Sequence, residues 1–562
     1  MAGLMNEQQI DSRCQELERY WQDRNKKFQE WYTIIQMIDT LAQSGMESFV
    51  GNDPRAAFNL LVSVLNQPTY HALPSSRLTV ENLKASSDLA NFYDTAWNDV
   101  MQTYRQRGRT FDRDLIKFFL ATGWGFIYSN FTIDGTAVTA EPLNPATVYP
   151  MWDDTLFECS RKLTPGKNAL LRMALRNKWG NMASPSDSTV LRDYWYLDDG
   201  GKVHNSIIID GRAVKPDTLE SKLNSIPKPR IPIFGAPVGG LPDRGEIAQS
   251  NAFFKKEMGQ SAIATNENVY ATINRWRTFM SQILRDTSQP KTYEKSSRAE
   301  KIVKPGEWDK RGAHFKLGLQ DEVGYIQPPA MAVEMRSSTM DLEAMEQRGG
   351  PSWSMYGDVS SQMTAYVMSQ IVSSTNQAAC EFHDGICDIK TDIDNWWREL
   401  IRDSGFKPYN YKLDKLIENE RVEATFEMRI PGDLVQRATA AKMLNPNFTV
   451  SPEYIYSHQF QDIRNPMEED ARIRAAEARR SPEFAEITKI AALRQEALNL
   501  RAAKDTKSAQ LYEKLANTLE QRLTGSMEQQ TGNGNIQQPK TRIRPEVSPP
   551  NQSEPIAMEG AI

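Results

Sequence analysis

The sequence predicts an α+β protein in which helix predominates. Three observations support this fold class: long runs of apolar residues at helical spacing, two β-hairpin patterns between residues 125 and 210, and the composition of a folded chain. Hydrophobic residues make up 40% and charged residues 25% of the 562 residues, so most of the chain can bury a core. At about 150 residues per domain, this length indicates about three to four domains.

Charge and cysteine content exclude two broad classes of protein. The chain has 67 basic and 72 acidic residues, a formal charge of -5, which excludes a histone-like protein whose overall charge binds nucleic acid but allows a local basic patch. The four cysteines argue against a secreted disulfide scaffold and favour a reducing compartment.

The N-terminal sequence lacks the basic start and apolar core of a signal peptide. No stretch approaches the about 18 apolar residues that cross a bilayer. We therefore expect a soluble protein without a membrane partner.

Four helical runs are predicted within the first 121 residues. Residues 6–48 carry apolar side chains three, four and seven positions apart, which is typical of an amphipathic helix; they are Leu17, Trp21, Phe28, Trp31, Ile34 and Ile38. Further helices are expected over 54–66, 86–107 and 110–121, the last with Gly123 as its C-cap.

Two hairpins follow these helices. Residues 125–131 and 136–143 alternate around the turn Asp134-Gly135, and residues 192–198 and 203–210 flank Gly200-Gly201. Both patterns combine β-branched or aromatic residues with turn residues, which is typical of paired antiparallel strands.

The second half of the chain alternates long helices with short breaks. Helices are predicted over 245–289, 331–348, 359–403 and 451–524, with short strands in 291–330 (such as HFKLGL, 314–319) and a strand over 422–430. Within 451–524, one helix is expected to begin with Pro466 in its first turn, and four leucines recur every fourth residue: Leu511, Leu515, Leu519 and Leu523. Residues 526–562 are rich in Gln, Gly, Asn, Pro and Ser and are expected to be disordered.

No catalytic or cofactor signature is visible. The sequence has no phosphate-binding G-x-x-x-x-G-K-[ST], no G-x-G-x-x-G after a strand, no H-E-x-x-H and no G-x-S-x-G. Cys380, His383 and Cys387 share one helix face, but a structural zinc site normally needs four ligands, so we interpret them as packing residues. We expect no enzyme activity, no cofactor and no metal.

One segment departs from the balanced charge. Residues 291–316 contain four acidic residues and eight basic ones: Lys291, Lys295, Arg298, Lys301, Lys304, Lys310, Arg311 and Lys316. The segment is either a patch that faces DNA or a partner, binding phosphate charge without reading bases, or a solvated loop.

The order of these elements resembles the portal protein of tailed bacteriophages over roughly residues 120–525. The stretches that carry the resemblance are GWGFIYSNFTIDGTAVTAEPLNPATVYPMWDD (123–154), NENVYATINRWRTFMSQILRDTSQP (266–290), GGPSWSMYGDVSSQMTAYVMSQIVSSTNQA (349–378) and IPGDLVQRATAAKMLNPNFTVSPEYIYSHQFQDIRNPMEEDARIRAAEARR (430–480). Each stretch by itself is a modest pattern, and the resemblance rests on the order of the stretches along the chain.

The resemblance implies a division of the chain into the parts of a portal subunit. They are an N-terminal helical region and wing (1–244), a first stem helix (245–290), a clip (291–330), a second stem helix (331–348), a channel loop (349–362), a wing helix with strands (363–450), a helical crown (451–525) and a disordered tail (526–562). The eight basic residues above would contact DNA or terminase in the clip.

The resemblance also implies residues that face the channel. The candidate loop residues are Gly349, Gly350, Ser352, Trp353, Ser354, Tyr356 and Gln362, and the candidate acids that line the channel are Glu334, Asp341, Glu343 and Glu346. Uncharged loop residues would not grip phosphates, and the glycines would allow a sharp reversal of the chain. Each acid has a plain alternative as a solvent-facing charge paired along its helix.

In function, the resemblance implies a homododecameric ring at one capsid vertex of the virion, assembled in the host cytoplasm. Its expected partners are the terminase large subunit, the major capsid protein and scaffold, head-completion or tail adaptor proteins, and double-stranded DNA in non-specific transit. The alternatives are another structural virion or scaffold protein without a DNA channel, or an enzyme of nucleic-acid metabolism, for which the required motifs are missing.

Overall fold

The computed structural model describes most of the chain. The described residues are 5–42, 48–74, 77–79, 81–132, 134–153, 155–179, 185–240, 259–288, 291–297, 302–304, 306, 310, 314, 316–326, 333–351, 365–426, 428, 466–480, 482–502 and 505–531. The chain divides into two compact units, Met1–Arg464 and Asn465–Ile562, called unit 1 and unit 2 below. The fold mixes helix and sheet with helix predominating, as the sequence predicts.

Unit 1 begins with five helices. They are α1 (Glu7–Tyr20), α2 (Gln22–Ile35), α3 (Asp53–Leu65), α4 (Leu83–Gln106) and α5 (Phe111–Thr122). The predicted helices over 54–66, 86–107 and 110–121 are confirmed within a few residues. Gly123 adopts φ 70° after α5, so the predicted glycine C-cap is confirmed.

The single helix predicted over 6–48 is wrong in two respects. The segment breaks at Trp21, whose indole Nε1 donates to the Pro150 carbonyl at 2.9 Å and whose ring meets Trp124 edge-on. Anchoring this side chain in the core turns the chain between α1 and α2. Beyond Ile35 the helix stops, Met37 takes φ 56°, and Ile38 is 53% exposed, so the apolar pattern past this point is not a buried stripe.

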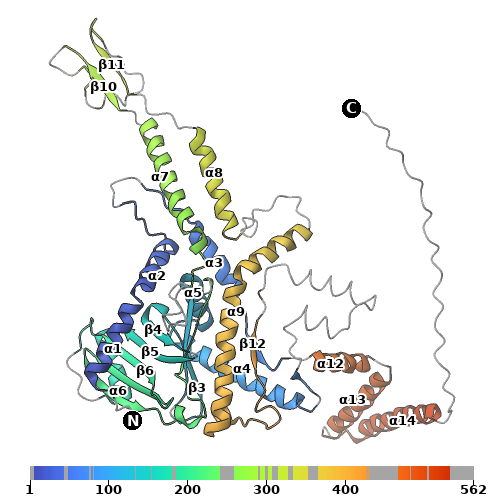
Figure 1. Cartoon of the computed structure of the whole chain (residues 1–562). Coiled ribbons are helices and arrows are strands. Elements are labelled where there is room, and N and C mark those ends of the chain that lie inside the picture. The colour runs from blue at the N-terminus through green and yellow to red at the C-terminus, as the bar shows by residue number, and fades with distance from the viewer. Residues whose placement is uncertain are drawn as a thin grey trace, which may run out of the picture. The chain divides into compact units, whose positions relative to one another are not determined.

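Two antiparallel sheets follow α5 (Figure 1). A three-stranded sheet has the order β3-β2-β9, and a five-stranded sheet has the order β4-β5-β6-β7-β8. The strands are β2 (Trp124–Phe131), β3 (Val138–Leu143), β4 (Val148–Trp152), β5 (Leu156–Leu163), β6 (Leu191–Leu197), β7 (Val203–Ile209), β8 (Arg212–Leu219) and β9 (Ile233–Pro237), with α6 (Lys167–Asn177) between β5 and β6. Both predicted hairpins are confirmed, as β2–β3 and β6–β7.

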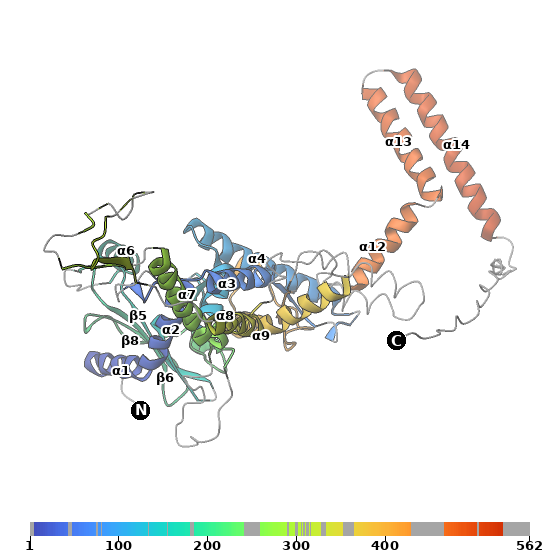
Figure 2. The same ribbon diagram turned by 90° about the horizontal axis from the view of Figure 1, so that it is seen from above.

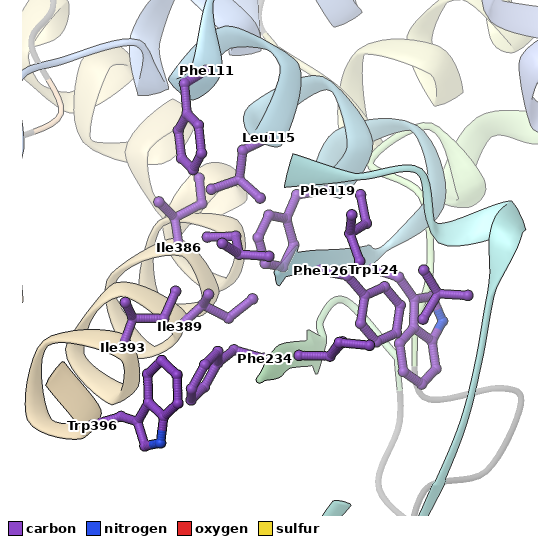
Figure 3. Close-up of a cluster of buried hydrophobic side chains, with 14 of the residues drawn as sticks. Phe111, Leu115, Phe119, Trp124, Phe126, Phe234, Ile386, Ile389, Ile393 and Trp396 are labelled. Atoms are coloured by element: carbon purple, nitrogen blue, oxygen red, sulfur yellow. The ribbon is translucent and has the colours of Figure 1, made fainter. Parts of the chain in front are cut away.

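Helix α9 (Ala365–Ser404), the longest of the described helices, packs on β2, β9 and α5. Figure 3 shows the resulting core, in which Phe111, Leu115 and Phe119 of α5 and Phe126 of β2 approach Ile386, Ile389 and Ile393 of α9. A short pair formed by β1 (Tyr70–Ala72) and β12 (Glu423–Thr425) closes this region. The strand predicted over 422–430 is therefore confirmed over three residues, while residues 427, 429 and 430 lie outside the described part.

Two helices of unit 1 stand apart from this core: α7 (Glu267–Ser288) and α8 (Val333–Arg348), with the strands β10 (Thr292–Lys295) and β11 (Glu322–Tyr325) between them in sequence. Within the described residues, the helix predicted over 245–289 is present from Glu267, and residues 259–266 are not part of it. Residues 259–266 form a bridge, a turn and a short 3-10 helix because their backbone amides bond distant carbonyls, Gln260 to Val238 and Ala262 to Leu120, at 2.9 Å each. Residues 241–258 lie outside the described part.

A strand predicted at 314–319 is also wrong. Its described residues are irregular or in a turn, Leu319 is fully exposed, and β11 begins three residues later. The turn is held by Asp321, whose carboxylate accepts from the backbone N–H of Gly318 at 2.8 Å.

The described residues of unit 2 are helical except Arg480 and Asp505. It contains α12 (Pro466–Arg479), α13 (Pro482–Ala502) and α14 (Thr506–Thr531), and α13 and α14 lie side by side in Figure 2. The predicted helix start at Pro466 is confirmed. Disorder from residue 526 is wrong for 526–531, because α14 runs through Gly525; a glycine inside a helix costs about 1 kcal/mol and does not by itself end it.

The leucine stripe of α14 is not a single buried seam. Ala516 and Leu519 pack with Ile490 and Leu493 of α13, whereas Leu511 and Leu515 are 68% and 51% exposed.

Candidate functional site: the helix pair and its tip hairpin

The most distinctive feature of unit 1 is an excursion formed by α7, β10, β11 and α8. Figure 1 shows α7 and α8 side by side, with the β10–β11 hairpin (the tip hairpin) at one end of the pair and the rest of unit 1 at the other end, which we call the root. The predicted helix–strand–helix order of residues 267–348 is thus present in the structure.

At the root, α7 is tied to two earlier segments, α2 and residues 49–51. Glu267 receives an ion pair from Lys27 at 3.0 Å and a hydrogen bond from the Trp31 indole at 2.7 Å. About two turns further along α7, Asn274 Oδ1 accepts a hydrogen bond from the backbone N–H of Gly51 at 2.8 Å. One turn beyond that, Thr278 Oγ1 accepts a hydrogen bond from the backbone N–H of Phe49 at 2.9 Å. These bonds fix the direction in which α7 leaves the core.

Asn266 joins the two helices of the pair. Its side chain is 2% exposed and donates from Nδ2 to the Glu346 carbonyl at 2.8 Å. Gly349 passes so close that an added Cβ would lie 2.1 Å from Asn266 Oδ1. Glycine is therefore required at 349 by this close approach, whereas the sequence suggested a reversal of the chain as the reason.

The root also carries a charge cluster around Arg277. Its guanidinium pairs with Glu343 of α8 at 2.9 Å and lies 3.8 Å from Asp53 of α3. Glu346 is close to this cluster and partly buried. Desolvation, with the added repulsion of Asp53 and Glu343, raises the pKa of Glu346 to about 7.

A pH-dependent stability follows from Glu346. Because its pKa is raised in the folded state, unit 1 binds this proton more tightly than the unfolded chain, so stability falls as pH rises from about 4.5 to about 7. Glu346→Gln is expected to be more stable than the native protein at pH 8 by about 1–2 kcal/mol, after allowance for solvent screening, and to converge with it near pH 4.5.

The measurement is urea unfolding at several pH values, with tryptophan fluorescence as the readout. All twelve tryptophans lie at or before Trp397, so the signal reports unit 1. Glu343→Gln serves as the matched control, because it loses the ion pair to Arg277 and should be destabilised at pH 8. If both variants changed the free energy of unfolding at pH 8 equally and with the same sign, the raised pKa of Glu346 would not be the source of the pH dependence.

Beyond the root, the pair has few buried side chains. The buried residues of α7 are Tyr270, Ile273 and Thr278, and none of its residues from 279 to 288 is buried. Four large apolar side chains of the pair are exposed by 43–68%: Phe279, Leu284, Met340 and Met345. Packing of α7 against α8 therefore leaves this apolar surface in contact with water, which is energetically unfavourable.

The tip hairpin is a two-stranded antiparallel ribbon, in register from Thr292–Tyr325 to Lys295–Glu322. Polar side chains join its two sides. Tyr293 Oη donates a hydrogen bond to Glu322 at 2.8 Å, and Ser296 Oγ donates one to Asp321 at 2.8 Å. All four residues of β10 are exposed. Two strands without a covering layer are marginally stable in water.

The predicted basic residues that the structure describes are all exposed on or near this hairpin: Lys291, Lys295, Lys304, Lys310 and Lys316. Arg298, Lys301 and Arg311 lie outside the described residues.

The other predicted site residues are only partly described. Gly349 and Gly350 are at the root, whereas Ser352, Trp353, Ser354, Tyr356 and Gln362 lie outside the described residues, as does the side chain of Glu334. Of the remaining predicted acids, Asp341 is exposed, Glu343 pairs across to α7 and Glu346 is partly buried beside it. The structure thus brings Glu343 and Glu346 together with Arg277 and Asp53, residues that the sequence did not single out.

Cys380, His383 and Cys387 lie on α9, but their donor atoms do not converge on one point. Cys387 Sγ is 3.7 Å from His383 Nε2, and this nitrogen also lies 2.7 Å from the Phe426 carbonyl. Among the described residues, no group of three or more His, Cys, Asp or Glu is arranged to hold a metal ion. Nor does any described helix have the length and apolar character needed to cross a membrane.

Comparison with known proteins gives only distant likenesses. No protein-family model matches the chain, and no curated protein matches it. Among solved structures, a chain from the neck of an empty gene transfer agent particle aligns at TM-score 0.38 with 9% identity, over 72% of this chain and 89% of that one. A chain from the neck of the native particle aligns at TM-score 0.37 with 10% identity, over 73% and 89%. These values do not assign a family or a function to the chain.

Proposed function

We propose that this protein is the subunit of a phage-type portal: a ring with a central channel at one capsid vertex, through which double-stranded DNA is packaged and later ejected. The observation that carries the proposal is the excursion of α7, the tip hairpin and α8. It is anchored at the root by Glu267, Asn274 and Thr278, and beyond the root it carries apolar side chains that one subunit leaves exposed.

In this proposal α7 and α8 are the stem helices and residues 291–330 are the clip. Neighbouring subunits cover Phe279, Leu284, Met340 and Met345, so that the helix pairs form a closed wall. Isolated, each pair exposes apolar area worth roughly 25 cal/mol per Å², which favours association.

The tip hairpin is the end of the subunit that meets other proteins. Its exposed lysines give a basic surface suited to terminase, to adaptor proteins or to passing phosphates without base readout. Asp341, exposed on α8, is the acid best placed to line the channel, where it repels DNA and keeps it sliding. The chain contributes architecture, and the motor that hydrolyses ATP is a separate protein.

Assembly of the full-length protein tests the proposal. We expect negative-stain electron microscopy to show rings with a central hole, and native mass spectrometry of the same sample to give about twelve subunits; if the purified chain stays monomeric, scaffold and major capsid protein are added. A chain that remains monomeric with both present would contradict the proposal.

A double variant makes the test specific to the helix pair. Leu284→Glu with Met340→Glu places two charges at side chains that are 64% and 68% exposed, so the fold should persist while rings are lost. Leu175→Glu is the matched control, since Leu175 is 80% exposed and lies on α6, outside the helix pair. Rings that form equally well in the double variant would show that the helix pair is not the subunit contact.

A further inference from the structure

A second feature of unit 1, separate from the proposed ring contacts, is the positive charge of the segment around α6. Residues 159–186 contain six basic residues and no acidic one. This surplus of six exceeds that of residues 291–316, where eight basic residues are offset by four acidic ones. Arg161 and Lys162 pair with carboxylates at 3.9 and 2.6 Å. The other four lie on α6 or at its C-cap: Lys167, Arg172, Arg176 and Lys178.

These four basic side chains are exposed, and none of them forms an ion pair with another described residue. Asp187 lies beside the start of α6, but its carboxylate accepts from the backbone N–H of Lys167 at 2.9 Å. Arg172 and Arg176 are four positions apart on the helix, so their like charges repel each other. The outer surface of α6 therefore carries positive charge that the described part of the chain does not neutralise.

The same helix exposes an apolar pair. Leu170 packs with Leu191 of β6 and Ile209 of β7, so this face of α6 is held on the five-stranded sheet. Leu171 and Leu175 do not belong to that cluster and are 38% and 80% exposed. A helix that already buries one apolar face thus presents a second apolar stripe to solvent, which is typical of a surface that contacts another protein.

The apolar and basic stripes lie beside each other. Leu171 and Leu175 are four positions apart and form one stripe along the helix. Arg172 and Arg176 follow them directly in sequence and form the neighbouring stripe. We propose that this face of α6 docks an acidic amphipathic helix of a partner protein. Apolar side chains of the partner cover the two leucines, and its carboxylates pair with the two arginines, whose planar guanidinium groups favour bidentate contacts.

The apolar stripe favours a protein over a nucleic acid as the occupant. Phosphates would neutralise the exposed cations but would leave Leu175 in water, because the phosphate backbone offers no apolar group. An acidic helix with its own apolar stripe satisfies both features of the surface. Helix α6 is only about 16 Å long, so the contact is small and its affinity is micromolar. Salt should weaken binding, because the cations are exposed.

Fluorescence anisotropy with the full-length protein tests the proposal with a defined probe. The probe is a labelled peptide of three LEAALEA heptads, whose leucines and glutamates form adjoining stripes on a helix. We expect saturable binding with a micromolar Kd. Peptides of three LSAALSA or SEAASEA heptads, which lack the glutamates or the leucines, should bind at least tenfold more weakly. Absence of binding by the LEAALEA peptide, or equal binding of all three peptides, would overturn the proposal.

Two double variants locate the binding on α6. Arg172→Glu with Arg176→Glu reverses the basic stripe, and Leu171→Ser with Leu175→Ser removes the apolar one. All four side chains are exposed, so the fold should persist. Each double variant should weaken binding of the LEAALEA peptide at least tenfold. Unchanged affinity in both variants would place the peptide elsewhere on the protein and refute the assignment.

A third double variant serves as the control. Arg55→Glu with Lys84→Glu reverses two exposed charges on α3 and α4 and should change the peptide affinity less than threefold. Two results would give the surface to another occupant and overturn the proposal: a DNA duplex that binds α6 more tightly than the peptide, or loss of rings in the α6 variants, which would place a second copy of the chain there. Peptide binding is measured whether or not rings form, so failure of the portal proposal is distinguishable from failure of this one.

Discussion

Replacing Asp394 by alanine is expected to remove about 3–5 kcal/mol from the free energy of unfolding of unit 1. Asp394 is fully buried on α9, where one carboxylate oxygen lies 2.5 Å from His71 Nδ1 and the other accepts from the Trp97 indole at 2.9 Å. The alanine variant leaves both partners buried without this acceptor, and an unmet buried polar group costs more than the bond itself contributes.

The position of this carboxylate explains the size of the effect. His71 lies on β1, which pairs with β12 across more than three hundred residues of sequence, and Trp97 lies on α4. Tyr93 of α4 donates its hydroxyl to the Asp394 backbone carbonyl at 2.9 Å, so α4, β1 and α9 meet at one residue. Removing the carboxylate loosens all three contacts together.

Urea unfolding at pH 7.5, monitored by tryptophan fluorescence, measures the loss in unit 1. Asp388→Ala is the matched control, because Asp388 lies on the same helix and is exposed, and it should shift stability by no more than about 0.5 kcal/mol. A similar small shift for Asp394→Ala would mean that neighbouring groups satisfy His71 and Trp97 without it.

The second large effect is expected for Phe119→Ala, which should destabilise unit 1 by about 3–5 kcal/mol. Phe119 of α5 is fully buried between β2 and α9 (Figure 3), and both neighbours approach it with glycine. A Cβ added to Gly125 would lie 2.1 Å from the ring, and one added to Gly385 would lie 3.2 Å from it. Because neither glycine carries a side chain that could move into the space, the cavity left by the variant should close only in part.

Phe118→Ala provides the comparison, since Phe118 is the adjacent residue of the same type and is half-buried; its loss should be smaller, about 1–2 kcal/mol. Phe119→Leu should recover part of the difference. If Phe118→Ala lowered the free energy of unfolding as much as Phe119→Ala, the packing of Phe119 between Gly125 and Gly385 would not explain the loss.

Local patterns of the sequence predicted the elements whose contacts are close along the chain. The β2–β3 and β6–β7 hairpins, the cap at Gly123 and the start of α12 at Pro466 depend on neighbouring residues, so turn chemistry and periodicity suffice to find them. The helix–strand–helix order of residues 267–348 was also visible, because α7 and α8 end at Gly and Pro signals.

The errors arose where a distant partner overrides local preference. The α1–α2 break follows from anchoring Trp21 to Pro150, and the irregular backbone of residues 259–266 follows from bonds to Val238 and Leu120. The 3-residue strand β1 has too little sequence of its own to be recognised and exists through its pairing with β12. None of these contacts can be predicted from a window of ten or fifteen residues.

For the candidate site, residue order was enough to predict the alternation of helices and strands, the basic character of residues 291–316 and the resemblance to a portal. Only the folded structure shows which of these side chains form contacts and which are exposed to solvent. Glu343 and Glu346 face Arg277, and Gly349 is fixed by its close approach to Asn266. The physical reason is that burial and charge pairing are properties of groups brought together from distant parts of the chain, and these set pKa values and exposed apolar area in ways that residue order alone does not specify.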